Sequence, residues 1–171
     1  MALNSSCKTP VELSKTRLTL LLAAGFCLPL LYAQTQSSGY LSAGQLQKVS
    51  GKRNAALQVK IPLVVKEGYH VNSNQPSEEY LIPLKLTWTE MGALEGGTVT
   101  YPKPSLEKYE FSEQPISVYT GSFDLVASFK VAAKAAAGPG AATGKLRYQA
   151  CSHRACYPPK TLEVTVSYQV Q

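Results

Sequence analysis

Residues 146–168, LRYQACSHRACYPPKTLEVTVSY, contain two alternating apolar runs on either side of a pair of cysteines. Apolar residues occupy every second position of both runs, Leu146, Tyr148 and Ala150 in the first and Leu162, Val164, Val166 and Tyr168 in the second. This alternation is typical of β-strands that have one buried face. Pro158 and Pro159 stiffen the exit from the intervening loop because each fixes φ and removes a backbone donor. The stretch therefore predicts two strands that hold Cys151 and Cys156 close together at the edge of a sheet.

Other segments upstream have the same strand-like pattern. We expect strands at residues 57–65, 81–88, 98–101 and 123–131. Pro62, which cannot donate to a ladder, suggests that the 57–65 strand lies at a sheet edge. No window has sustained helical periodicity, and 44% hydrophobic residues suffice for a core. The sequence predicts an all-β fold, a β-sandwich.

The segments between these strands are expected to be turns and loops. Residues 92–97 predict a turn, and residues 102–115 predict an irregular connection that is too long for a simple turn. Residues 132–144 are rich in alanine and glycine. The alanines before Gly138 are too few to repay helix nucleation, so we expect a mobile hairpin loop there.

Residues 1–33 have the pattern of a secretory signal peptide. Basic residues come first, Lys8, Lys15 and Arg17. The apolar run that follows, Leu18 to Leu31, is too short to span a bilayer comfortably. We expect cleavage after Ala33 and a periplasmic or otherwise exported protein. Residues 34–55 are polar and aperiodic, and they predict a flexible lead-in, either a tether or a loosely ordered strand, before a domain at residues 56–171.

Two alternatives to cleavage stay open, an uncleaved anchor and lipidation of Cys27, although Phe26 occupies the place of the small residue of a lipoprotein signal. Cleavage would remove Cys7 and Cys27 and leave only Cys151 and Cys156. An exported protein holds such a pair as a disulfide unless a partner reduces it. Removing three basic residues and one acidic residue leaves 14 basic and 10 acidic side chains, a net charge of +4. This modest excess is spread along the chain, so we expect no nucleic-acid partner.

Three functions are open for the cysteine pair: a redox-active disulfide, a disulfide that only stabilises the fold, and a metal site. A disulfide that closes a loop of about six residues stabilises a fold by only ~2 kcal/mol in the chain-entropy model. This small gain argues against a purely structural disulfide. His153 could complete a ligand set with the cysteines and His70, but no second ligand pair is present, so we expect no metal and no cofactor. His153 and Arg154 either stabilise a thiolate or point into solvent.

The motif Tyr148-Gln149-Ala150-Cys151, a short loop, then Cys156-Tyr157-Pro158-Pro159, resembles the N-terminal periplasmic domain of DsbD-type thiol:disulfide interchange proteins. Weaker matching stretches are residues 68–73, 80–84 and 118–121, so the similarity extends over about residues 57–170. The resemblance implies an immunoglobulin-like β-sandwich. No membrane electron-conducting domain or thioredoxin-like domain follows in the sequence, so we expect a stand-alone exported domain.

The resemblance also implies roles for individual residues. Cys156 would form the mixed disulfide with partners, and Cys151 would resolve it. Phe111 is the candidate cap that shields the cysteine pair, with Glu110 beside it. The alternative is that Phe111 is an ordinary residue of the hydrophobic core. Tyr109 stands where the best-known member has an acid, so a carboxylate contribution would rest on Glu110. His153, Arg154 and Tyr157 are the candidate modulating residues.

The function expected from the sequence is a relay of reducing equivalents by thiol–disulfide exchange, a protein-disulfide reductase type of activity. The expected partners are thioredoxin-fold proteins, one that donates electrons and one that accepts them, and a separately encoded membrane electron-conducting protein. The alternative is a non-catalytic exported immunoglobulin-like binding module with one structural disulfide.

Overall fold

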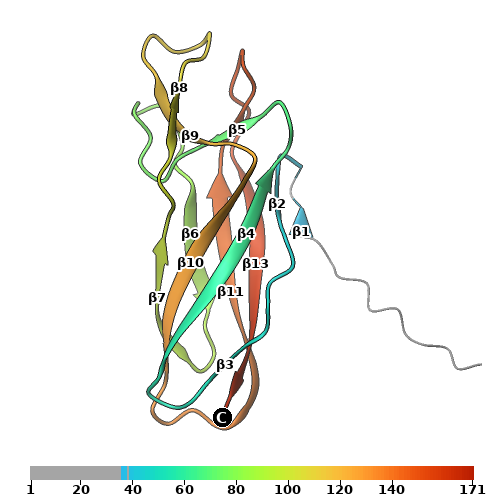
Figure 1. Ribbon diagram of the computed structural model, residues 1–171, viewed down its shortest axis with the longest axis vertical. Coiled ribbons are helices and arrows are strands. Elements are labelled where there is room, and N and C mark those ends of the chain that lie inside the picture. Colours follow the sequence, from blue (N-terminus) through green and yellow to red (C-terminus); the bar gives the residue numbers. More distant parts are fainter. Residues whose placement is uncertain (1–35, 38) are drawn as a thin grey trace, which may run out of the picture. The chain divides into compact units, whose positions relative to one another are not determined.

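Two layers of β-strands form the body of the domain in the computed structural model, which describes residues 36–37 and 39–171. The first layer contains β1 (Gln36–Ser37), β2 (Leu41–Ala43), β4 (Ala56–Val65), β10 (Ser122–Val131) and β7 (Leu94–Thr100), in that order. The second contains β3 (Val49–Gly51), β13 (Lys160–Val170), β11 (Gly138–Tyr148) and β6 (Lys85–Glu90). The fold is an all-β, immunoglobulin-like β-sandwich, as predicted (Figure 1). Within the described residues no helix is long and apolar enough to cross a membrane.

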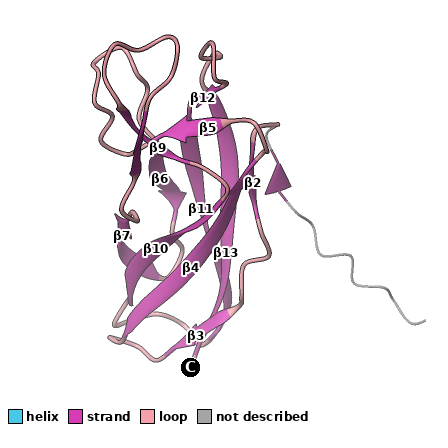
Figure 2. Cartoon of the chain, turned by 45° about the horizontal axis from the view of Figure 1, so that its top comes forward, coloured by secondary structure: helices cyan, strands magenta, loops and turns pink. Residues whose placement is uncertain are grey.

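A third, smaller sheet lies at one end of this body (Figures 1 and 2). Its order is β12 (Ala150–Cys151), β5 (His70–Asn72), β9 (Ile116–Tyr119) and β8 (Ser105–Glu107). Only Gln149 separates β11 from β12, so the long strand of the body leads directly into the first cysteine. The small sheet therefore brings together three segments that lie far apart in the sequence.

The main core lies between the two layers and follows the alternation read from the sequence. Along β4 every second residue is buried, Leu57, Val59, Ile61, Leu63 and Val65. The predicted strands 57–65 and 123–131 are confirmed by β4 and β10, which pair antiparallel along nearly their whole length. Burying one such aliphatic side chain contributes about 1.5–3 kcal/mol relative to leaving it in water.

The N-terminal part of the described chain belongs to both layers. The stretch 34–55, expected as a flexible lead-in, contains β2 and β3 as well as β1, and Leu41 and Ala43 are fully buried in the core. Because β2 pairs with β4, Pro62 does not mark an edge strand. The pairing of β2 with β4 instead ends next to Pro62, whose carbonyl accepts a hydrogen bond from Gly44 N at 2.9 Å. The expected signal peptide, residues 1–33, lies outside the described residues.

The prediction of a mobile loop over residues 132–144 is wrong from Gly138 onward. β11 begins there and pairs with β13 along all of its 11 residues. The ring of Tyr168 packs directly over Gly140, where an added Cβ would come within 2.4 Å of the ring. Glycine is needed for this close approach. The run of small residues is therefore a packing surface for Tyr168.

Three further boundaries differ from the expectation. β6 begins at Lys85, and residues 81–84 are irregular because they lie against the small sheet, where Leu81 is buried. The expected turn at 92–97 is shorter, since β7 begins at Leu94, and its glycines lie beside a bulge opposite Ser128 and Phe129. The irregular connection at 102–115 contains β8, which pairs with β9.

Candidate redox site

The two cysteines close a tight loop at the end of the sandwich. Cys151 and Cys156 form a disulfide, and their Cα atoms lie 3.9 Å apart across an isolated antiparallel bridge. The loop between them is held by its own backbone, because Ser152 N donates to the Ala155 carbonyl at 2.8 Å. Below the disulfide, Tyr157 N donates to the Ala150 carbonyl at 2.9 Å. These hydrogen bonds fix the direction from which each sulfur can be reached.

The two sulfurs differ in exposure. Cys151 is 0% exposed, and its strand neighbours Tyr148 and Ala150 point inward, as the alternation predicts. Cys156 is partly exposed and packs against a small second apolar cluster together with Phe111. The buried members of that cluster are Leu81, Tyr109, Ile116 and Val118. Cys156 is therefore the more accessible residue of the pair.

Strand β5 lies directly beside the first cysteine. His70 is the register partner of Cys151, so the two side chains share one face of the small sheet. His70 is 2% exposed, and its buried Nε2 has no hydrogen-bond partner in the described structure. Burial lowers the pKa of His70 to about 4, the Glu107 carboxylate partly opposes this effect, and His153 adds to it. The imidazole is therefore neutral at physiological pH.

The loop that carries Tyr109 and Phe111, here called the aromatic loop, covers the imidazole of His70. The Tyr109 ring stacks on His70 with 3.8 Å between centroids, and the Phe111 ring lies 5.7 Å from that of Tyr109 in a nearly parallel orientation. Tyr109 is buried, whereas Phe111 remains partly exposed. The sequence singled out Phe111 as the cap, and the structure places its ring 6.1 Å from that of His70 and 5.7 Å from that of Tyr109, centroid to centroid. Tyr109 is the more deeply inserted ring, which sequence reasoning missed.

Glu110 joins this loop to the cysteine loop. Its backbone N–H donates to the His153 carbonyl at 3.3 Å. Its carboxylate lies 3.5 Å from His153 Nε2 and 3.9 Å from Arg154 Nε. All three side chains are more than half exposed, so these ion pairs are screened and weak. His153 and Arg154 thus face the aromatic loop, and among the described residues neither side chain contacts a sulfur.

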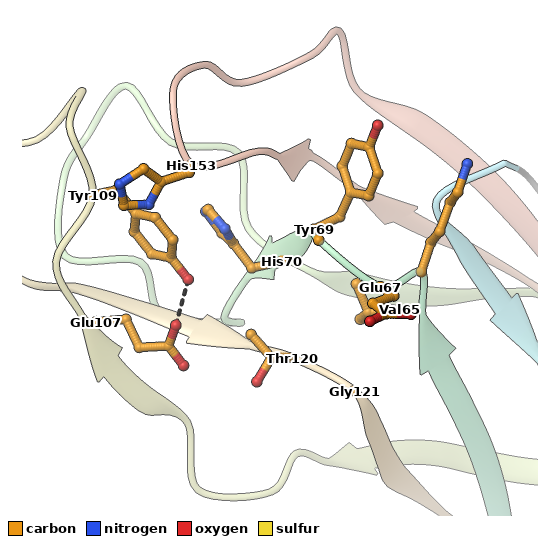
Figure 3. A pocket seen from close by; sticks show the side chains of 11 residues that line it. Val65, Glu67, Tyr69, His70, Glu107, Tyr109, Thr120, Gly121 and His153 are labelled. Atoms are coloured by element: carbon orange, nitrogen blue, oxygen red, sulfur yellow. Dashed lines mark hydrogen bonds between the residues drawn. The ribbon is translucent and has the colours of Figure 1, made fainter.

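A cavity of about 480 Å³ opens beside the stack (Figure 3). Its wall includes His70, Glu107, Tyr109 and His153. The Tyr109 hydroxyl donates to Glu107 Oε2 at 2.5 Å, and burial together with this acceptor raises the pKa of Tyr109. The carboxylate that anchors the aromatic loop is therefore that of Glu107, which sequence reasoning did not single out.

The described residues include no group of three or more His, Cys, Asp or Glu side chains that could hold a metal ion.

Tyr157 lies on the other side of the cysteine loop, in a cluster of three tyrosines. Its ring is 5.0 Å from that of Tyr40 and 5.9 Å from that of Tyr69, centroid to centroid. The ammonium group of Lys160 lies 4.9 Å from the Tyr40 centroid. This packing holds the segment that follows Cys156.

The sequence model of one protein family covers most of this structure. The family is described as thiol:disulfide interchange protein DsbD, N-terminal, and its model matches residues 37–168. The chain belongs to this family. Its members are N-terminal domains of thiol:disulfide interchange proteins, and the Cys151–Cys156 disulfide provides a pair suited to that exchange. Comparison with curated protein sequences gives no match.

Two solved structures are similar to this DsbD N-terminal family member. The N-terminal periplasmic domain of ScsB from Proteus mirabilis superimposes with a TM-score of 0.54 at 12% identity, covering 77% of this chain and 50% of that chain. The reduced DsbD N-terminal domain of Neisseria meningitidis gives a TM-score of 0.42 at 23% identity, covering 70% of this chain and 86% of that one. The chain thus spans half the length of the ScsB domain, and that likeness shows the shared fold.

Several site residues of this family member could not be placed from the sequence. From the sequence, His70 was considered only as a possible metal ligand, and Asn72 stood out only within the weak stretch 68–73, about eighty residues before the cysteines. Glu107 carried no local pattern, and Tyr109 was noted only as the replacement of an acid. His70 and Asn72 lie near the disulfide because β5 pairs with β12, and Tyr109 and Glu107 because the Tyr109 ring stacks on His70. No local pattern encodes either contact.

Proposed function

We propose that this DsbD N-terminal domain is an exported thiol–disulfide exchange protein that relays reducing equivalents between thioredoxin-fold partners through Cys151 and Cys156. The observation that carries the proposal is the unequal burial of the two cysteines: Cys151 is fully buried, whereas Cys156 is partly exposed and packs against the same small apolar cluster as Phe111. Exchange proceeds through a mixed disulfide in which one sulfur faces the incoming thiolate while the other leaves. This arrangement supports Cys156 as the attacked atom and Cys151 as the leaving and resolving sulfur.

The reducing half of the relay takes two displacement steps. A thiolate of the reduced donor attacks Cys156 Sγ, the bond between the two cysteines breaks, and Cys151 leaves as a thiolate that takes up a proton. The second donor thiol loses its proton and attacks the donor sulfur of the mixed disulfide, so Cys156 leaves as a thiolate. The donor ends as a disulfide and the domain as a dithiol, two electrons having passed.

The oxidising half reverses these roles. The Cys156 thiolate attacks the disulfide of an oxidised acceptor and releases one acceptor thiolate, which takes up a proton. Cys151 then loses its proton and attacks Cys156 Sγ, which releases the second acceptor thiolate and restores the disulfide. The chemistry needs no bound cofactor. A membrane electron-conducting protein fits the role of donor or of the donor's own source of electrons.

The aromatic loop supports this function by limiting access. Phe111 packs in the same small cluster as Cys156, so a partner must displace it to reach the sulfur. Glu110, His153 and Arg154 form the polar hinge between the two loops, and Tyr157 holds the exit from Cys156. In this proposal Phe111 and Glu110 shield the pair, while His153, Arg154 and Tyr157 modulate it.

Localisation outside the cytosol supports the same reading. The proposed domain organisation is a signal peptide at residues 1–33, removed after Ala33, followed by the exported domain. Cleavage leaves one cysteine pair, as suits an oxidising compartment. The structurally similar ScsB domain is described as periplasmic.

A redox titration tests the function directly. We would equilibrate the full chain, carrying Cys7→Ser and Cys27→Ser, with glutathione buffers and count reduced thiols by alkylation and mass. A relay disulfide exchanges reversibly and shows a midpoint within the range of the buffers. A structural disulfide has a potential below about −300 mV and stays oxidised. The second outcome would instead favour a non-catalytic binding module.

A further inference from the structure

The carboxamide of Gln149 has a fixed orientation beside the cysteine loop. Its Oε1 accepts from the backbone N–H of Ile82 at 3.0 Å, and its Nε2 donates to the Tyr157 carbonyl at 3.2 Å. A backbone N–H can only donate and a carbonyl can only accept, so a flipped amide would lose both bonds. Gln149 Oε1 is therefore an oxygen that requires donors.

This orientation determines that of Asn72. Asn72 Nδ2 donates to Gln149 Oε1 at 3.0 Å and to the Ile82 carbonyl at 3.1 Å, which uses both of its hydrogens. A flipped Asn72 amide would place its oxygen against two other oxygens. Asn72 Oδ1 must consequently point the other way, where it lies 4.0 Å from Cys151 Sγ. Both Asn72 and Cys151 are 0% exposed.

In the disulfide form, Asn72 Oδ1 has no hydrogen-bond donor. A disulfide sulfur carries no proton, and no other N–H or O–H of the described residues donates to Asn72 Oδ1. A buried acceptor without a donor destabilises the state in which it occurs. Reduction changes this, because it breaks the S–S bond and gives Cys151 an S–H group beside the waiting oxygen.

We propose that Asn72 is a positioning residue that accepts a hydrogen bond from the Cys151 thiol and thereby shifts the thiol–disulfide equilibrium toward the dithiol form. The inference rests on the proposed function, since it assigns a control of that exchange. The network stabilises the reduced state, whose thiol satisfies Oδ1, relative to the oxidised state, whose sulfur does not. The two electrons and two protons of reduction come from the donor dithiol, and the Cys151 proton is the one that Oδ1 binds.

The same contact makes the two thiols unequal. An S–H that donates to a buried carbonyl oxygen favours the neutral thiol, and the negative end of the amide dipole opposes a thiolate at the same place. The contact therefore favours the protonated form of the Cys151 thiol. The titratable groups that face this region are His70, opposite Cys151, and Tyr109, Glu107 and His153 around it. His70 is neutral at pH 7, so it adds no positive charge that would favour a Cys151 thiolate.

The first test compares Asn72→Leu with the parent chain in the glutathione titration, with Cys7→Ser and Cys27→Ser in both. Leucine has a similar volume and no acceptor. A buried hydrogen bond of ordinary strength predicts about a fivefold shift of the equilibrium constant toward the disulfide, seen as roughly 20 mV in a two-electron couple. Ser117→Ala is the matched control, since it removes a buried hydrogen bond to Ser73 Oγ in the same sheet. It should lower the free energy of unfolding and leave the equilibrium unchanged.

The second test needs no substitution at Asn72, in case Asn72→Leu does not fold. In Cys156→Ala on the same background, Cys151 is the only thiol, and its infrared S–H stretch reports hydrogen bonding directly. We expect a band lowered relative to that of a thiol without a hydrogen-bond acceptor. A band at the free-thiol position, or a folded Asn72→Leu with an unchanged equilibrium, would overturn the proposal. Reversible titration of the parent chain tests the relay itself, so failure of one idea is distinguishable from failure of the other.

Discussion

The imidazole of His70 stacks against the phenol ring of Tyr109, with 3.8 Å between the ring centroids and 24° between the ring planes. His70 is the register partner of Cys151, and Tyr109 belongs to the loop that carries Phe111. The Tyr109 hydroxyl is also tied to Glu107. The inner part of the loop is thus anchored at two points, whereas Phe111 is partly exposed. In the proposed function, we therefore expect Phe111 to be the ring that a partner displaces while Tyr109 stays in place.

Removal of the Phe111 ring should expose the outer sulfur. In reduced protein, Phe111→Ala is expected to raise the alkylation rate of Cys156 by about fivefold, because an aromatic contact of this kind is worth about 1 kcal/mol. The free energy of unfolding should fall by only about 1–2 kcal/mol, less than the ~3–5 kcal/mol of a fully buried phenylalanine. The measurement is the rate of reaction with a small alkylating reagent, followed by mass.

Phe123→Ala is the control for this experiment. Phe123 is also partly buried, but its ring stacks on Tyr119, 4.7 Å away centroid to centroid. Its truncation should reduce stability to a similar extent without changing the alkylation rate. Equal rates in the parent and Phe111→Ala proteins would remove Phe111 from the site and return it to the role of an ordinary packing residue.

The difference in burial between the sulfurs predicts asymmetric trapping. Cys151→Ala leaves Cys156 free to form a mixed disulfide that cannot be resolved, so it should accumulate a covalent complex with a thioredoxin-fold partner. Cys156→Ala leaves only the buried thiol and should trap several-fold less. Non-reducing gels of both variants after incubation with a periplasmic extract, followed by identification of the adducts, would show the difference. Similar amounts of adduct from both variants would contradict the assignment of roles.

Burial of His70 predicts that stability falls in mild acid. The folded-state pKa of about 4 lies below the ordinary value of 6.5, so the unfolded chain binds more protons between these two pH values. The contribution is fully present above pH 6.5 and is lost as the pH falls toward 4. Between pH 7.5 and pH 5 this residue alone should lower the free energy of unfolding by about 2 kcal/mol.

His70→Phe separates this effect from other titrations. Phenylalanine keeps a ring beneath Tyr109 but does not titrate. Denaturant unfolding at pH 7.5 and pH 5 should therefore show a smaller loss in the variant than in the parent chain, by about the same 2 kcal/mol. If both proteins lose stability equally, His70 is not the group that responds to pH.

Export makes a prediction about mass. The protein recovered from the periplasm should have the mass of residues 34–171, and treatment with an alkylating reagent without reductant should add nothing, because Cys151 and Cys156 are joined. The added mass of two alkyl groups should appear only after reduction. Recovery of a protein that retains residues 1–33 would contradict cleavage and favour an anchored form.

The strands of the sandwich could be predicted where one face is buried and the other is not. In β4 and β10 the alternation of apolar and polar residues is a local consequence of that burial, so the sequence alone indicates both strands. The same reasoning failed for residues 138–144. Their small residues carry no apolar alternation, and they are a strand because they pair with β13, where Gly140 lets the Tyr168 ring pack over the backbone.

What the sequence determined about the site by itself is the disulfide loop, because five positions of separation and stiff prolines bring two sulfurs together locally. The inward direction of Tyr148 and Ala150 is of the same kind, since strand periodicity settles it. The groups that surround the sulfurs, in contrast, are brought there by the packing of distant segments. His70 and Asn72 reach Cys151 through strand pairing across about eighty residues, and Glu107 reaches the site through the Tyr109 hydroxyl. Such contacts depend on register and burial, which are properties of the packed chain and not of any single segment.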